Sequence, residues 1–258
     1  MELPIDEVLA IIRSTRRKSL PLWGKVEVQS QKSASATDVV TKIDFEIEEY
    51  LAKEFTKIDP TIAFVGEEHG GDRTAPRHWL ADPIDGTAHF VRGLPFCTTI
   101  MALIENGKVS FSAIYDFVND IMYHAERGKG AYKNSETIRV SDRPLGSSLM
   151  FYESNLNKDD NLNTYLAFKK KTTILNTLNA GYEFSLIASG KIEGRICLDP
   201  FGKDYDFAPG SLLVAEAGGI VANIGSKEFD CQNLNFIAAN KVVYEELTFG
   251  QDAIFPLI

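Results

Sequence analysis

Residues 79–87 read Trp-Leu-Ala-Asp-Pro-Ile-Asp-Gly-Thr and join an apolar strand to a polar turn that carries two carboxylates. A carboxylate directly at the end of an apolar strand is costly unless water, a hydrogen bond or a cation satisfies it. Because Pro83 restricts the backbone, we expect Asp82 and Asp85 to point into one space, with the Ile84 carbonyl between them. Carboxylates and a main-chain carbonyl are the ligands that a hard divalent cation prefers. The segment therefore predicts a cation site.

Three other segments place carboxylates where helices or strands are expected to begin or end. They are residues 38–44 (Asp-Val-Val-Thr-Lys-Ile-Asp), 66–68 (Gly-Glu-Glu) and 204–206 (Asp-Tyr-Asp). Taken alone, each acidic motif has an ordinary structural interpretation as a helix cap, a solvated helix start or a turn in which aspartate caps the backbone. The presence of all four in one chain favours a shared acidic site.

The segments around these motifs predict a first half built on strands. Ile43, Ile47, Leu51 and Phe55 recur every four residues and predict a helix. After Pro60 the pattern changes to short apolar runs, and an Asn-Gly pair at 106–107 indicates a hairpin. The predicted strands are 61–65, 78–81, 98–104, 109–116, 121–125 and 131–140. Residues 109–115 alternate, which is typical of a strand with one buried face.

From about residue 145, strands and helices alternate along the chain. The predicted strands are 149–152, 173–175, 192–198, 220–223 and 236–239, and the predicted helices are 161–170, 181–189 and 208–217. We therefore expect a layered α+β or α/β fold in two halves. The N-terminal half, residues 1–145, has an antiparallel sheet and most of the acidic motifs. The C-terminal half, residues 146–258, has a mixed sheet and contains Asp206.

Composition limits the classes of partner. The chain has 258 residues, of which 44% are hydrophobic, so it can bury a full core. Its formal net charge is −9, and an acidic surface repels nucleic-acid backbones and anionic lipid. We therefore expect neither nucleic acid nor a membrane as a partner. An anionic substrate would need a local positive charge, for which a metal ion is the natural candidate.

Cysteine usage and hydropathy bear on the compartment. The three cysteines, Cys97, Cys197 and Cys231, are widely separated and form no C-x-x-C pair, so neither disulfides nor a thiolate zinc site is expected. This usage is typical of proteins in a reducing compartment. Residues 1–10 lack a basic-then-apolar signal pattern, and no apolar run approaches the ~20 residues of a membrane helix. We therefore expect a soluble, cytoplasmic protein.

Taken together and in this order, the four acidic segments resemble the inositol monophosphatase family of lithium-sensitive, magnesium-dependent sugar phosphatases. The matching motifs are Asp-x-Val-Thr-x-x-Asp at 38–44, Gly-Glu-Glu at 66–68, Trp-x-x-Asp-Pro-Ile-Asp-Gly-Thr at 79–87 and Tyr-Asp-Phe-Ala-Pro-Gly at 205–210. The resemblance runs over nearly the whole chain. It implies an αβαβα layered sandwich of the sugar-phosphatase type, a homodimer, and Li⁺ as a possible inhibitor.

The resemblance also implies a set of metal ligands for two to three Mg²⁺ ions. Glu67, Asp82 and the Ile84 carbonyl would hold the first ion. Asp82, Asp85 and Asp206 would hold the second ion. In a site of this kind, one ion lowers the pKa of the attacking water and another neutralises the leaving oxygen.

Catalytic and substrate-binding roles are implied in the same way. Asp44, Glu67 and Thr87 would be the catalytic residues: Asp44 and Glu67 would help to place a third ion or its water, and Thr87, paired with Asp44, would position the attacking water. The implied substrate-binding residues are Asp85, Gly86, Thr87, Ala180, Asp199 and Asp206. Asp199 stands where the family has a glutamate, and Leu178 where it has a glycine, so the alcohol-binding surface departs from the family pattern.

The resemblance implies Mg²⁺-dependent hydrolysis of the phosphate monoester of a small polyol, such as inositol 1-phosphate or another sugar phosphate. The partner would be a small phosphorylated substrate. Alternatives are a 3′(2′),5′-bisphosphate nucleotidase, a histidinol-phosphate phosphatase, or a non-catalytic regulatory protein that retains the fold. Ile84 favours the first interpretation, since the nucleotidase branch typically has leucine there. Every acidic ligand position is filled, which argues against a non-catalytic protein.

Overall fold

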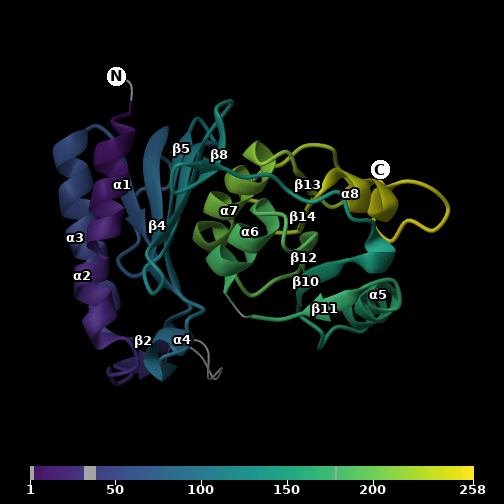
Figure 1. Cartoon of the computed structure of the whole chain (residues 1–258), viewed down its shortest axis with the longest axis horizontal. Helices are drawn as coiled ribbons and strands as arrows, with labels where there is room; N and C mark the ends of the chain where they lie inside the picture. Colours follow the sequence, from purple (N-terminus) through teal and green to yellow (C-terminus); the bar gives the residue numbers. More distant parts are fainter. Residues whose placement is uncertain (1–2, 32–38, 178) are drawn as a thin grey trace.

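The computed structural model describes residues 3–31, 39–177 and 179–258, and in these ranges the chain forms five layers (Figure 1). An outer helical layer of α1 (Ile5–Ser14), α2 (Arg16–Ser19) and α3 (Lys42–Ile58) covers a seven-stranded sheet. Helices α6 (Ala180–Ala188) and α7 (Asp204–Glu216) separate this sheet from a five-stranded one. Helices α5 (Asp159–Lys169) and α8 (Lys241–Thr248) lie on the far side. The αβαβα sandwich is confirmed.

The seven-stranded sheet follows the chain in the order β3-β4-β5-β6-β7-β8-β9. Its strands are β3 (Ala63–Gly66), β4 (Arg77–Asp85), β5 (Thr98–Glu105), β6 (Lys108–Asp116), β7 (Ile121–Glu126), β8 (Gly130–Lys133) and β9 (Glu136–Thr137). β3 runs parallel to β4, and all the remaining neighbouring strands of this sheet pair antiparallel. The expectation of a purely antiparallel sheet is wrong for this pair, because the chain crosses from the end of β3 back to the start of β4.

The predicted hairpin between β5 and β6 is confirmed. Asn106 and Gly107 both have positive φ, 50° and 76°, as a two-residue turn of the hairpin type requires. The prediction of a single buried face on β6 is wrong, because layers cover both sides of the sheet. Phe111 and Tyr115 pack towards α1 and α3, while Ile114 packs towards the central helices.

The five-stranded sheet has the order β11-β10-β12-β14-β13 and is mixed, as predicted. Its strands are β10 (Leu149–Ser154), β11 (Thr173–Leu175), β12 (Gly194–Leu198), β13 (Ile220–Asn223) and β14 (Phe236–Ala239). β10 pairs in parallel with β11 and β12, and β14 pairs antiparallel with β12 and β13. The chain passes from one sheet to the other between Thr137 and Leu149. The division into 1–145 and 146–258 stays a prediction.

The central helices bind the two halves together. α7 packs on β5 and β6 of the first sheet and on β13 and β14 of the second. One core cluster accordingly contains Ile100 and Ile114 from the first sheet, Leu213 from α7, and Phe236 from the second sheet. Burying both faces of α7 explains why its sequence shows little amphipathic periodicity.

Several boundaries differ from the predictions. β4 continues through the acidic turn to Asp85 instead of ending at residue 81, because Asp85 still pairs with Thr98 of β5. α7 begins at Asp204 and not at residue 208, because the Lys203 amide donates to the Asp206 carboxylate and starts the helix there. Helices α4 (Thr87–Arg92) and α8 were not predicted. None of the helices in the described ranges combines the length and the apolar character of a membrane span.

Close contact between α6 and α7 requires a glycine. A Cβ on Gly210 would lie 2.0 Å from the Cγ and Cδ2 atoms of Phe184. We expect Gly210→Ala to destabilise the protein by about 1–3 kcal/mol, because the ring has no free space into which it can move. Thermal or denaturant unfolding measures the change. Gly146→Ala is the matched control, since its Cβ would meet no atom within 4 Å; equal loss in both variants would contradict the packing argument.

Candidate metal centre and active site

Three carboxylates from separate parts of the chain meet between the first sheet and the central helices. Asp82, Asp85 and Asp206 each offer an oxygen atom, and these atoms lie within 4.8 Å of one another. Asp82 and Asp85 end strand β4, and Asp206 lies in the first turn of α7. We call these three residues the acidic cluster. Asp82 and Asp85 are buried, and Asp206 is partly buried.

An irregularity at the end of β4 places both strand carboxylates in the cluster. The pairing with β5 shifts register between Asp82 and Asp85. The Asp82 carboxylate accepts the Ile84 amide at 2.9 Å, and the Thr99 hydroxyl donates to the Pro83 carbonyl at 2.8 Å. Because Pro83 has no N–H to pair with β5, the strand can bend here without leaving a donor unsatisfied.

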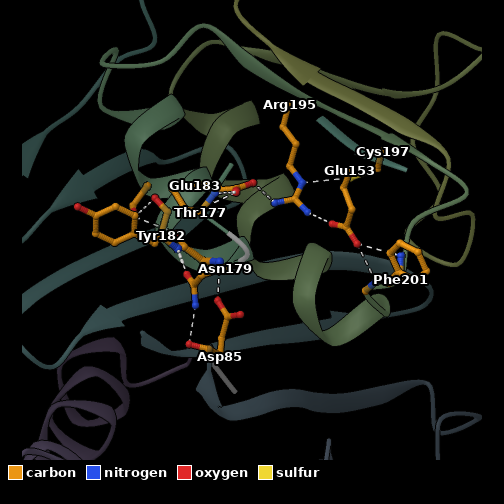
Figure 2. A network of polar contacts seen from close by, with 12 residues as sticks. Asp85, Glu153, Thr177, Asn179, Tyr182, Glu183, Arg195, Cys197 and Phe201 are labelled. Carbon is orange, nitrogen blue, oxygen red and sulfur yellow. Dashed lines mark hydrogen bonds and ion pairs between the residues drawn. The ribbon is translucent and has the colours of Figure 1, made fainter. Parts of the chain in front are cut away.

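Donors from both halves of the chain hold Asp85. Its Oδ2 accepts the Gly181 amide at 2.6 Å and the Thr98 hydroxyl at 3.1 Å. The Asn179 side chain donates to the Asp85 carbonyl at 2.5 Å and also caps α6, as Figure 2 shows. A Cβ on Gly181 would lie 2.5 Å from the Thr98 hydroxyl oxygen, so only glycine allows this approach.

Asp44 and Thr87 lie together beside the acidic cluster. Asp44 is buried at the start of α3, where its Oδ2 accepts the Thr41 amide at 2.9 Å and the Thr41 hydroxyl at 2.6 Å. The Thr87 hydroxyl lies 3.0 Å from both Asp44 Oδ1 and the Ile84 carbonyl oxygen. The predicted Thr41 and Asp44 capping box is confirmed. Asp38, the first residue of that motif, lies outside the described residues.

The segment that carries Glu67 is held by a buried glutamate of α3. Glu48 accepts the amides of Glu68 and His69, both at 2.8 Å. A Cβ on Gly66 would lie 2.1 Å from the Glu48 carboxyl carbon, so glycine is needed there. The Glu67 amide donates to the Ala81 carbonyl at 3.0 Å, which sets Glu67 beside the end of β4.

Burial and like charge shift the pKa values of these acids upwards. Burial raises the pKa of Asp82 well above its usual range, and the charges of Glu67 and Asp85 add to the effect. Burial likewise raises the pKa of Asp206, of Asp85 to about 7, and of Asp44 to about 6. Carboxylates gathered in this way are stabilised in the ionised form by a cation.

The donor set fits a hard divalent cation. The acidic cluster, Glu67 and the Ile84 carbonyl offer only oxygen atoms, which suit Mg²⁺, Ca²⁺ or Mn²⁺. Neighbouring arginines are engaged elsewhere: in the described ranges Arg73 pairs with Asp204, and Arg195 pairs with Glu153 and Glu183. The negative charge of the cluster is therefore left for a cation to neutralise.

The remaining predicted substrate residues lie in two different environments. Gly86 directly precedes α4 and has a φ of 89°. A Cβ added at Gly86 would lie 2.6 Å from the side-chain nitrogen of Asn179. Ala180 is buried at the start of α6. The Asp199 carboxylate is 41% exposed and pairs with Lys158 at 2.5 Å. Leu178 lies outside the described residues.

Residues that support the site were missed by the motif analysis. Glu48 follows Asp44 by one helical turn, so its spacing on the predicted helix could have indicated a second acid on the same face. Thr98 opens a predicted strand and carries no signal of its own. The pairing of Glu153 and Glu183 with Arg195 joins distant segments, and the sequence contains no local sign of it.

A family model described as the inositol monophosphatase family matches residues 6–251. The chain belongs to the inositol monophosphatase family. Two curated relatives are a fructose-1,6-bisphosphatase/inositol-1-monophosphatase of Thermotoga maritima, 31% identical over 94% of this chain and 93% of its own length, and the Nus factor SuhB of Pseudomonas aeruginosa, 30% identical over 86% of each. Inositol monophosphatase 1 of Mus musculus is 28% identical over 90% of this chain and 88% of its own.

Solved structures agree with this assignment. The Thermotoga maritima IMPase superposes with a TM-score of 0.84 at 28% identity, covering 94% of both chains. The extragenic suppressor protein suhB from Bartonella henselae has a TM-score of 0.84 at 26% identity, covering 92% of this chain and 94% of its own. This member of the family is a phosphoric monoester hydrolase, and its acidic cluster is a group of carboxylates that could hold a metal ion.

The raised pKa values predict how this phosphatase responds to pH without metal. In chelator, we expect a thermal transition that persists but shifts to lower temperature as the pH rises from about 5 to about 8. Because Asp85 has a pKa of about 7 and Asp44 of about 6, the folded chain holds protons that the unfolded chain releases above about pH 4. The stability that these protons contribute is lost as the pH passes through the folded pKa values.

Calorimetric melting at several pH values, with chelator and with Mg²⁺, measures this effect. The gain in melting temperature from Mg²⁺ should be larger at the alkaline end, where the cation no longer competes with protons. Asp85→Asn is the control, because it removes one of the titrating groups and should flatten the profile in chelator. A melting temperature that rises across this window in chelator would contradict the assignment.

Proposed function

We propose that this phosphatase hydrolyses the phosphate monoester of a small polyol, such as inositol 1-phosphate or another sugar phosphate, and that it requires Mg²⁺. The observation that carries the proposal is the meeting of Asp82, Asp85 and Asp206 within 4.8 Å, with the Thr87 and Asp44 pair beside them. Two relatives are named fructose-1,6-bisphosphatase/inositol-1-monophosphatase, which supports a sugar phosphate as the substrate class.

The proposed metal ligands are Glu67, Asp82, the Ile84 carbonyl, Asp85 and Asp206. Bound Mg²⁺, as two to three ions, would lower the pKa of a water molecule and neutralise charge on the leaving oxygen. An oxygen donor set of this kind would also admit Li⁺, which we propose as an inhibitor. The homodimer and the cytoplasmic location stay predictions.

In this proposal, Asp44 and Thr87 orient the attacking water and accept its proton. The Thr87 hydroxyl lies 3.0 Å from Asp44, so it can orient a water molecule while Asp44 receives the proton. Burial raises the pKa of Asp44 to about 6, which suits a group that accepts a proton near neutral pH. The two Thr41 contacts fix the other Asp44 oxygen and hold the carboxylate in orientation.

Direct attack by water needs no covalent intermediate. A thiol nucleophile is disfavoured because burial raises the pKa of Cys197 to about 12 and that of Cys97 further. Phosphate oxygens would be received by the amides of Gly86 and Thr87. The alcohol portion would extend towards Ala180 and Asp199, the proposed substrate contacts in the second half of the chain.

Asp85→Asn tests the proposed metal centre. We expect turnover to fall by at least about a hundredfold, because the loss of one charge weakens the second cation and the carboxamide keeps the volume. Steady-state kinetics on inositol 1-phosphate measures the change, with circular dichroism to verify the fold. Asp252→Asn, an exposed substitution of the same kind, is the control and should leave the rate unchanged. Near-normal activity of Asp85→Asn at millimolar Mg²⁺ would refute the proposed role.

Substrate selectivity is expected to be broad. Asp199 is shorter than the family glutamate and is held by Lys158, so it offers a weaker hydroxyl contact than a free, buried carboxylate. We expect several sugar phosphates and nucleoside monophosphates to have kcat/KM values within about tenfold of one another. The panel should include inositol 1-phosphate, fructose 1,6-bisphosphate, a 3′,5′-adenosine bisphosphate and histidinol phosphate.

The same panel separates the alternatives. Strong preference for the bisphosphate nucleotide or for histidinol phosphate would select the nucleotidase or the histidinol-phosphate phosphatase. Absence of hydrolysis on every compound, with Mg²⁺ bound, would favour the regulatory binding protein. Asp199→Glu should sharpen selectivity towards polyol phosphates, and a wild type that already prefers one of them by orders of magnitude would overturn the argument from Asp199.

A further inference from the structure

A buried arginine joins two acidic residues behind the acidic cluster. Arg195 of β12 forms ion pairs with Glu183 of α6 and Glu153 of β10, and only 3% of the arginine is exposed. Its guanidinium also lies 5.5 Å from the Phe184 ring centre and 5.1 Å from that of Phe207. The planar fork of an arginine can bind two carboxylates at once, which a lysine cannot do with the same geometry. We call Glu153, Glu183 and Arg195 the arginine triad (Figure 2).

One arm of the triad leads to Asp206. The Oε1 atom of Glu153 accepts the amides of Phe201 and Gly202, both at 2.9 Å. The next amide along the chain, that of Lys203, donates to the Asp206 carboxylate at 2.5 Å. Glu153 therefore holds the backbone directly before the group that orients Asp206.

The other arm leads to Asp85. Glu183 accepts the Thr177 amide at 3.2 Å and its hydroxyl at 2.8 Å. Thr177 precedes the segment in which Asn179 donates to the Asp85 carbonyl and Gly181 to the Asp85 carboxylate. Figure 2 shows both groups of contacts: Asn179 on Asp85, and the series from Thr177 through Glu183 and Arg195 to Glu153 and Phe201.

A contribution to stability alone does not account for the triad. A buried ion pair gains little net free energy, because desolvation of the charges offsets their attraction. One end of this triad instead terminates on the Gly202 amide, directly before the Lys203 donor to Asp206. The other end terminates on Thr177, two residues before Asn179 and four before Gly181, which donate to Asp85. The triad, its contacts and the short stretches of chain between them therefore connect Asp85 to Asp206. An oxygen atom of each of these two carboxylates lies within 4.8 Å of the other.

We propose that the arginine triad sets the spacing between Asp85 and Asp206, and thereby the affinity of the cation that these two carboxylates share. Arg195 is a positioning residue, and it touches neither substrate nor metal. The inference rests on the metal centre of the proposed function. It adds that residues of β10, β12 and α6, which are not themselves metal ligands, control the cation affinity.

The test is a titration of Mn²⁺ into the protein without substrate, followed by calorimetry. Arg195→Lys keeps the charge and loses the fork, so a change in this variant reports geometry. Glu153→Gln breaks the ion pair and keeps an acceptor for the two loop amides. We expect the Mn²⁺ dissociation constant to rise about tenfold or more in both variants, as for partners that orient metal ligands. The half-saturating Mg²⁺ concentration should rise in parallel, while kcat at saturating Mg²⁺ keeps most of its value.

Glu193→Gln is the matched control. Glu193 is as buried as Arg195 and lies in the same half, where it accepts the Leu149 amide and the Arg143 side chain, both at 2.6 Å. Its neutralisation should lower the melting temperature and leave Mn²⁺ affinity unchanged. A merely structural triad would give this same result for Glu153→Gln and Arg195→Lys, and that outcome would overturn the proposal.

Two further outcomes are distinguishable. If Arg195→Lys does not fold, Glu153→Gln decides the question, because the Glu153 side chain is 25% exposed and tolerates substitution better. If the wild type binds no Mn²⁺ and hydrolyses no phosphate ester, the proposed function fails and the inference falls with it. If the wild type binds Mn²⁺ and both triad variants bind it equally well, only the inference fails.

Discussion

The structure depends on holding three carboxylates within 4.8 Å of one another in a largely buried position. Both desolvation and mutual repulsion oppose this arrangement, and burial accordingly raises the pKa of each member. The fold compensates with directed donors, since Ile84, Gly181 and Lys203 each give a backbone amide to one carboxylate. A divalent cation would supply the positive charge that these neutral donors lack, and with it the site would be suited to phosphate chemistry.

The layered architecture delivers these groups from both halves of the chain (Figure 1). The first sheet contributes the irregular end of β4, and α3 brings Asp44 and Glu48 against the same edge. The central layer contributes α7 with Asp206 and the start of α6 with Gly181. Since α7 packs on both sheets, a displacement of either sheet would move one wall of the site relative to the other. The arginine triad extends this coupling to β10 and β12.

Local sequence predicted most elements, and its errors have a common physical cause. The four-residue spacing from Ile43 to Phe55 and the Asn-Gly turn at 106–107 act within one segment, so both predictions are confirmed. The alternation in β6 suggested a single buried face, but layers from distant segments cover both sides of the sheet. The start of α7 was placed too late because Asp206 caps its own helix, a contact that depends on the backbone conformation at Lys203.

The sequence by itself determined the family, and its acidic motifs included the three carboxylates that the fold brings together. Tertiary structure alone decided which groups hold those carboxylates. The contacting residues are far apart in the sequence: Glu48 and Glu68 are separated by 20 positions, Arg195 and Glu153 by 42, and Gly181 and Asp85 by 96. Contacts of this range leave no periodic trace in the sequence, because they arise only when separate layers pack together. The pairing of Asp199 with Lys158 is another contact between separate segments, and the role of Asp199 towards substrate stays a prediction.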